Sequence, residues 1–150
     1  MIAILTSLLI VASAIGILCN ISVSADDVKV WDGSMDSDFE GSGSKTDPYR
    51  ITSAAELYGF AKKYCGEQPL ESEGKYLCLT DDIYLNDVFD SKWTEKSPRE
   101  WAFLNKWTIN ANVQGFRGDF NGNGHTVYGM YYENPNDWAA VMGLIPFASG

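Results

Sequence analysis

The sequence predicts a mainly β fold with one short α-helix, and three observations support this prediction. Apolar side chains alternate with other side chains over residues 77–85, which is the period of a β-strand. Asn-Gly pairs and glycines interrupt the second half of the chain, as sharp turns between strands require. The clearest helical spacing, with apolar residues three or four apart, lies at residues 53–65.

The N-terminal segment has the features of an export signal. Residues 1–25 carry no charge, and residues 2–18 form an uninterrupted run of apolar and small side chains that precedes Val23-Ser24-Ala25. This pattern is typical of a signal peptide with its cleavage site. We therefore expect residues 1–25 to be removed and the protein to be secreted or displayed on the cell surface. One departure from the signal-peptide pattern is that no Lys or Arg precedes the run. The alternative is a retained membrane anchor, because the 17 residues 2–18 reach the short end of a membrane-spanning helix.

The remaining residues 26–150 carry the whole formal charge of −9, with 20 Asp+Glu against 11 Lys+Arg. They also hold all 7 Phe, 8 Tyr and 5 Trp, and such aromatic content argues against disorder. An acidic surface repels phosphate groups, so nucleic acid is not an expected partner. The composition predicts one modest core, expected to be covered at one side by the helix.

The first elements after residue 26 can be placed by their local signals. Residues 26–46 predict a short strand followed by a loop, and residues 49–52 predict a second strand after the Asp47-Pro48 turn. Ser53 and Glu56 form a capping box that starts the helix at residues 53–65. Gly66 is expected to end this helix in the left-handed conformation.

The second half predicts strands separated by one long excursion. Residues 86–112 are irregular and read as a surface excursion with some packed aromatic rings. Residues 121–124, Asn-Gly-Asn-Gly, predict a tight turn before residues 125–132. The final apolar stretch spans residues 139–147. The expected core residues are Leu77, Leu79, Ile83, Leu85, Phe116, Phe120 and Val127.

Three stretches in this order resemble secreted and surface-attached bacterial proteins with GLUG-type repeats: GSGSKTDPYRITSAAELYGFAKKY, GKYLCLTDDIYLND and FRGDFNGNGHTVYGMYYENPNDWAAVMGLI. The resemblance implies the N-terminal part of a right-handed parallel β-helix, with the short α-helix as its cap. In such a fold, inward side chains stack over those of the next coil. About two coils would leave the last layer open, so self-association through that end is expected.

The cysteine count leaves two alternatives. Removal of the signal peptide also removes Cys19, which leaves Cys65 and Cys78. In an oxidising compartment these two form a candidate disulfide. The alternative is a pair of buried free thiols that pack as small apolar side chains.

The polar residues of the sequence do not indicate a catalytic set or a histidine-based metal site. His125 is the only histidine, and we expect it to be a corner residue that bonds to the preceding turn. Asp81 and Asp82 are explained by local backbone hydrogen bonds as well as by an acidic catalytic cluster. The acidic residues of 36–47 (Asp36, Asp38, Glu40 and Asp47) approach calcium-loop spacing, but a solvated loop without a cofactor is the favoured interpretation.

The aromatic residues suggest a binding role. Exposed rings on a solenoid wall can stack on sugars, and Tyr131 and Trp138 adjoin polar turns, so both are candidate glycan-binding residues. The leading prediction is a non-catalytic, exported surface or adhesion module whose partner is an extracellular glycan or surface protein. The alternative is the N-terminal portion of a polysaccharide-degrading β-helix lyase or hydrolase, with its catalytic coils outside this chain.

Overall fold

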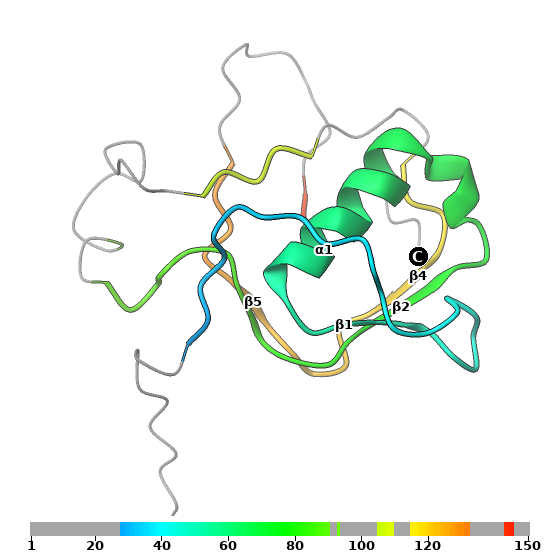
Figure 1. Cartoon of the computed structure of the whole chain (residues 1–150), viewed down its shortest axis with the longest axis horizontal. Coiled ribbons are helices and arrows are strands. Elements are labelled where there is room, and N and C mark those ends of the chain that lie inside the picture. Colours follow the sequence, from blue (N-terminus) through cyan, green and yellow to red (C-terminus); the bar gives the residue numbers. More distant parts are fainter. Residues whose placement is uncertain (1–27, 91–92, 94–104, 110–114, 133–142, 146–150) are drawn as a thin grey trace, which may run out of the picture.

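The computed structural model describes residues 28–90, 93, 105–109, 115–132 and 143–145. Within these residues, helix α1 (Ala54–Ala61) lies alongside the short strands (Figure 1). Within these described ranges, no helix has both the length and the apolar character needed to cross a membrane. The predicted signal peptide lies outside the described residues.

The strands form two small parallel sheets. The first sheet has the order β1-β2-β4, from β1 (Tyr49–Ile51), β2 (Tyr76–Leu79) and β4 (Asp119–Asn121). The second pairs β3 (Ile83–Tyr84) with β5 (Val127–Tyr128). All these pairings are parallel, so β4 and β5 do not form a hairpin across the turn between them.

The strand register places equivalent positions of successive segments of the chain beside one another. Leu77 pairs with Tyr49 on one side and Phe120 on the other, while Ile83 pairs with Val127. Val30 also forms an isolated parallel bridge with Tyr84. This stacking is what a β-helix requires. The five short strands within the described residues do not by themselves make a closed solenoid, so the β-helix class stays a prediction.

The start of α1 is confirmed, whereas its predicted end is wrong. The Ser53 hydroxyl accepts from the Glu56 amide at 3.2 Å, and the Glu56 carboxylate accepts from the Ser53 amide at 3.0 Å. After Ala61 the chain continues as a π-helix, Lys62–Glu67, that contains Gly66 without a positive φ. This wider turn places the adjacent Tyr64 and Cys65 together in the core, and their burial outweighs the glycine stop signal.

The core agrees with most of the expected residues. Five of them are buried: Leu77, Leu79, Ile83, Leu85 and Phe116. Phe120 and Val127 pack against the core but are only half-buried, because no described strand lies beyond β4 or β5. Trp107 and Ile109 are buried as well, so this part of the long excursion belongs to the core.

Candidate functional site

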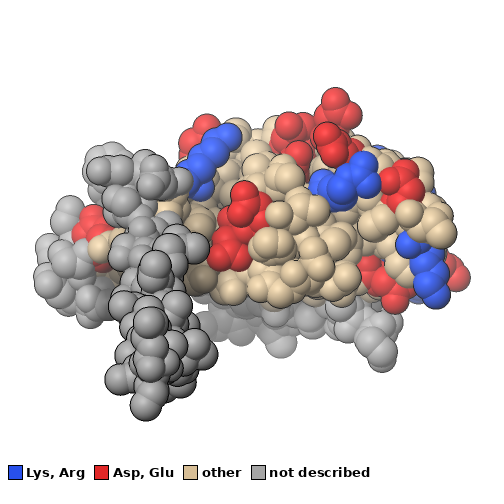
Figure 2. All heavy atoms as spheres, turned by 90° about the horizontal axis from the view of Figure 1, so that it is seen from below, with Lys and Arg blue, Asp and Glu red and all other residues tan. Residues whose placement is uncertain are grey.

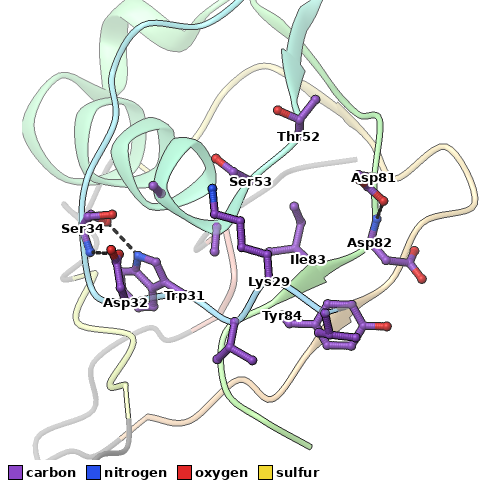
Figure 3. Close-up of a pocket in the computed structure, with 14 residues that line it drawn as sticks. Lys29, Trp31, Asp32, Ser34, Thr52, Ser53, Asp81, Asp82, Ile83 and Tyr84 are labelled. Carbon is purple, nitrogen blue, oxygen red and sulfur yellow. Dashed lines mark hydrogen bonds between the residues drawn. The ribbon is translucent and has the colours of Figure 1, made fainter. Parts of the chain in front are cut away.

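A groove of about 410 Å³ lies between residues 28–34, the start of α1 and residues 81–84. Its charged lining consists of Lys29, Asp32, Asp81 and Asp82, and Tyr84 adds an aromatic wall. In Figure 3, Lys29 extends between Asp32 on one side and the two other aspartates on the opposite side. Three separate parts of the chain therefore supply the polar groups of one groove.

Asp32 is fixed by a local turn. Its Oδ1 accepts from the Ser34 amide at 2.9 Å, and the indole nitrogen of Trp31 donates to the Ser34 carbonyl at 2.7 Å. Hydrogen bonds from Ser34 hold the pKa of the Asp32 carboxyl below its usual value, and the positive charge of Lys29 lowers it further. Asp32 is therefore anionic at neutral pH.

The opposite wall of the groove is held by a contact between two segments that lie far apart in the sequence. Asp82 Oδ1 accepts from the Thr126 amide at 2.9 Å and lies 3.3 Å from His125 Nδ1. The His125 amide donates to the Gly122 carbonyl at 2.8 Å, which confirms the predicted corner role. Asp81 Oδ1 accepts from the Asp82 amide at 2.8 Å, as expected for a local turn. The Asp82–His125 contact could not be predicted from the sequence, because only the parallel stacking of the strands joins these positions.

A stacked tyrosine pair borders the groove. Tyr84 and Tyr128 have ring centroids 4.5 Å apart with planes at 11°, and Phe89 lies 5.9 Å from Tyr84. Ile83 points into the core, so strand alternation turns Tyr84 to the outer face. Burial raises the pKa of the Tyr84 phenol, and the neighbouring Tyr128, Asp82 and Asp81 raise it further. The phenol is therefore a neutral hydrogen-bonding group at neutral pH.

Tyr84 was not among the residues singled out from the sequence. A signal was nevertheless present, because Ile83-Tyr84 and Val127-Tyr128 repeat the same order of a β-branched residue followed by tyrosine. With parallel pairing in register, such a repeat stacks the tyrosines on one outer face.

The two predicted glycan residues do not form this groove. Tyr131 is half-buried, and its hydroxyl is shielded from solvent without a hydrogen-bond partner in the described part of the chain. Tyr131 therefore does not present its hydroxyl at the surface, and it does not line the groove. Trp138 lies outside the described residues. A glycan-binding role for either residue stays a prediction.

Both cysteines considered for a disulfide are free thiols in the structure. Cys65 lies in the core, and burial raises its pKa to about 12. Cys78 is half-buried and alternates along β2 with the inward-facing Leu77 and Leu79. Cys65 therefore packs in the core toward which Leu77 and Leu79 point, whereas Cys78 points to the other face of β2. The disulfide between them stays a prediction.

Two carboxylates of the acidic loop considered for calcium pair with an arginine of the neighbouring strand β1. Arg50 pairs with Asp47 at 3.0 Å and with Glu40 at 3.3 Å. The Arg50 guanidinium holds the pKa of the Asp47 carboxyl below its usual value. Asp36 Oδ1 accepts from the Asp38 amide at 2.9 Å, as in a local turn. In the part of the chain that the structure describes, no group of three or more metal-ligating side chains comes together.

The surface electrostatics agree with the acidic composition. Figure 2 shows acidic side chains in several groups over one face, with basic side chains beside some of them. Comparison with protein-family models, curated proteins and solved structures finds no match to this chain. The resemblance to GLUG-type proteins therefore stays a prediction.

Proposed function

We propose that this chain is an exported, non-catalytic surface or adhesion module of the β-helix class that binds an extracellular glycan at the groove beside Tyr84 and Tyr128. The observation that carries the proposal is the stacked tyrosine pair at the edge of a groove of about 410 Å³. The uncharged residues 1–25 support export.

The groove combines the two kinds of group that hold a sugar. Aromatic rings contact the apolar faces of sugar rings, and polar side chains fix their hydroxyls. Tyr84 supplies the ring, while Thr52 and Ser53 line the groove with hydroxyl groups. The volume also falls within the range of about 300–1,000 Å³ that is usual for ligand sites.

We assign a structural role to the contacts of Asp82 with His125 and Thr126. One oxygen of Asp82 accepts from the Thr126 amide and also contacts the His125 ring, so this carboxylate joins two distant segments of the chain. In our proposal, this contact maintains the shape of the groove wall.

Isothermal titration calorimetry with the secreted protein tests the proposal against β-glucan, xylan, chitin, chitosan and polygalacturonate oligosaccharides. We expect at least one of them to bind, and we expect Tyr84→Ala to weaken that binding about tenfold because stacking is lost. Tyr84→Phe keeps the ring and should retain most of the affinity.

Tyr76→Ala is the matched control, because Tyr76 is a half-buried strand tyrosine on β2 that does not line the groove. Circular dichroism melting curves establish that each variant is folded. Absence of binding to every oligosaccharide, or equal binding by the folded Tyr84→Ala variant and the original protein, would overturn the proposal.

A further inference from the structure

We propose that the turn between β4 and β5 is a self-modifying site, at which Asn123 loses its side-chain nitrogen as ammonia and becomes aspartate or isoaspartate. The sequence contains two Asn-Gly pairs, Asn121-Gly122 and Asn123-Gly124, and both lie between these strands or at the end of β4. A glycine after an asparagine leaves its backbone nitrogen open to attack the asparagine side chain, because no side chain hinders the approach.

The reaction begins at the backbone nitrogen of Gly124, which attacks the side-chain carbonyl carbon of Asn123. A bond forms between these two atoms while the bond from that carbon to Nδ2 breaks. Nδ2 leaves as ammonia, and its third hydrogen is the proton of the Gly124 amide. Water then opens the resulting cyclic imide at either carbonyl, which gives aspartate or isoaspartate. The net change is one water taken up and one ammonia released.

The structure leaves the second pair free to react. Asn123 and Gly124 are exposed, and both have positive φ, of 50° and 80°. A Cβ added at Gly124 would have no heavy atom within 4 Å other than those of its chain neighbours, so open space surrounds the attacking amide. The peptide bond between the two residues can therefore rotate toward the side chain of Asn123 without a steric clash.

The first pair is held more firmly by the fold. Asn121 is the last residue of β4, where it pairs in register with Cys78 of β2. Its Oδ1 also accepts from the Asn123 amide at 2.9 Å, which fixes the side chain in the turn. Rotation of the peptide after Asn121 would disturb the end of the strand. Tertiary structure therefore distinguishes two pairs that have the same local sequence.

The nitrogen that leaves is the one that ties the turn to the preceding strand. Asn123 Nδ2 donates to the carbonyl of Leu79, the last residue of β2, at 3.2 Å. After the reaction a carboxylate oxygen faces that carbonyl, and two acceptors cannot form a hydrogen bond. Isoaspartate also lengthens the backbone by one carbon just before His125 and Thr126, which both contact Asp82. The modification therefore loosens the contact between these two segments.

Incubation of the secreted protein at mildly basic pH, followed by peptide mass spectrometry, measures both pairs in one experiment. We expect conversion to be about tenfold faster at Asn123 than at Asn121 in the folded protein. In urea the two rates should agree within about twofold, because the unfolded chain no longer distinguishes the pairs. Equal rates in the folded protein, faster conversion at Asn121, or an intact Asn123 after the unfolded chain has reacted would each overturn the proposal.

Asn123→Asp reproduces the aspartate product and tests its effect on the fold. Asn121→Asp is the matched control, because it adds the same charge while its side-chain oxygen can still accept from the Asn123 amide. Hydrogen exchange at the Thr126 amide, which donates to Asp82 at 2.9 Å, reports on the contact between the segments. We expect this exchange to be about threefold faster in Asn123→Asp and unchanged in Asn121→Asp. Unchanged exchange in both variants would show that the modification does not loosen the turn.

Discussion

Replacement of Asn86 by alanine should destabilise the protein more than any other single polar-to-alanine change among the described residues. Asn86 is 3% exposed and connects three parts of the chain through its side-chain amide. Its Nδ2 donates to the carbonyls of Asn105 at 2.9 Å and Gly129 at 2.8 Å, and its Oδ1 accepts from the Asn105 amide at 2.8 Å. Asn105 in turn donates from Nδ2 to the carbonyls of Leu85 and Trp31.

The size of the effect follows from these contacts. Asn86→Ala removes three hydrogen bonds to the backbone, each of which contributes about 1 kcal/mol net, so the free energy of unfolding should fall by about 3 kcal/mol. A domain of this size has a stability of roughly 5–15 kcal/mol. With a urea m-value of about 1.5 kcal/mol/M, the midpoint of unfolding should fall by about 2 M.

Urea unfolding monitored by tryptophan fluorescence measures this change, because Trp31 and Trp107 are buried close to one another. Asn121→Ala is the control, since Asn121 is exposed and makes a local bond to the Asn123 amide. Its effect should stay below about 1 kcal/mol. If the free energy of unfolding of a folded Asn86→Ala variant lay within about 1 kcal/mol of that of the original protein, the view that this amide joins distant segments of the chain would be refuted.

Four further predictions follow from burial and sequence pattern. Leu57 is fully buried in α1, so Leu57→Asp should abolish cooperative unfolding by burying an unpaired charge; full stability would show that the helix is peripheral. In the native protein, Cys78 should react with iodoacetamide at pH 8 while Cys65 resists. The free energy of unfolding should decrease from about pH 9 to 12, because burial raises the pKa of Cys65 in the folded protein and the thiol therefore ionises first in the unfolded chain. Protection of both thiols, with a mass lower by two hydrogens, would instead indicate a disulfide. Mass spectrometry of the expressed protein should find Asp26 at the N-terminus, and a membrane-bound chain with Met1 would favour the anchor. Light scattering should detect self-association through the β4 and β5 edges, and a stable monodisperse monomer would count against an open solenoid end.

Several local features of this protein could be predicted from the sequence because they depend on neighbouring residues. The Ser53–Glu56 capping box joins residues three apart, and the structure confirms it. The alternation over residues 77–85 places Leu77, Leu79 and Ile83 in the core, since successive side chains of a strand point to opposite faces. The role of His125 at a corner also follows from the adjacent Asn-Gly turn.

Other features depend on which distant segments become neighbours, and only the tertiary structure decided them. Burial of Tyr64 and Cys65 extends α1 through a π-turn despite Gly66, because the packing of both side chains outweighs a local stop signal. The Asp82–His125 contact and the Tyr84–Tyr128 stack each join residues more than 40 positions apart. Parallel pairing in register creates both contacts, and that register is set by stacking of the core side chains rather than by the residues that form the groove.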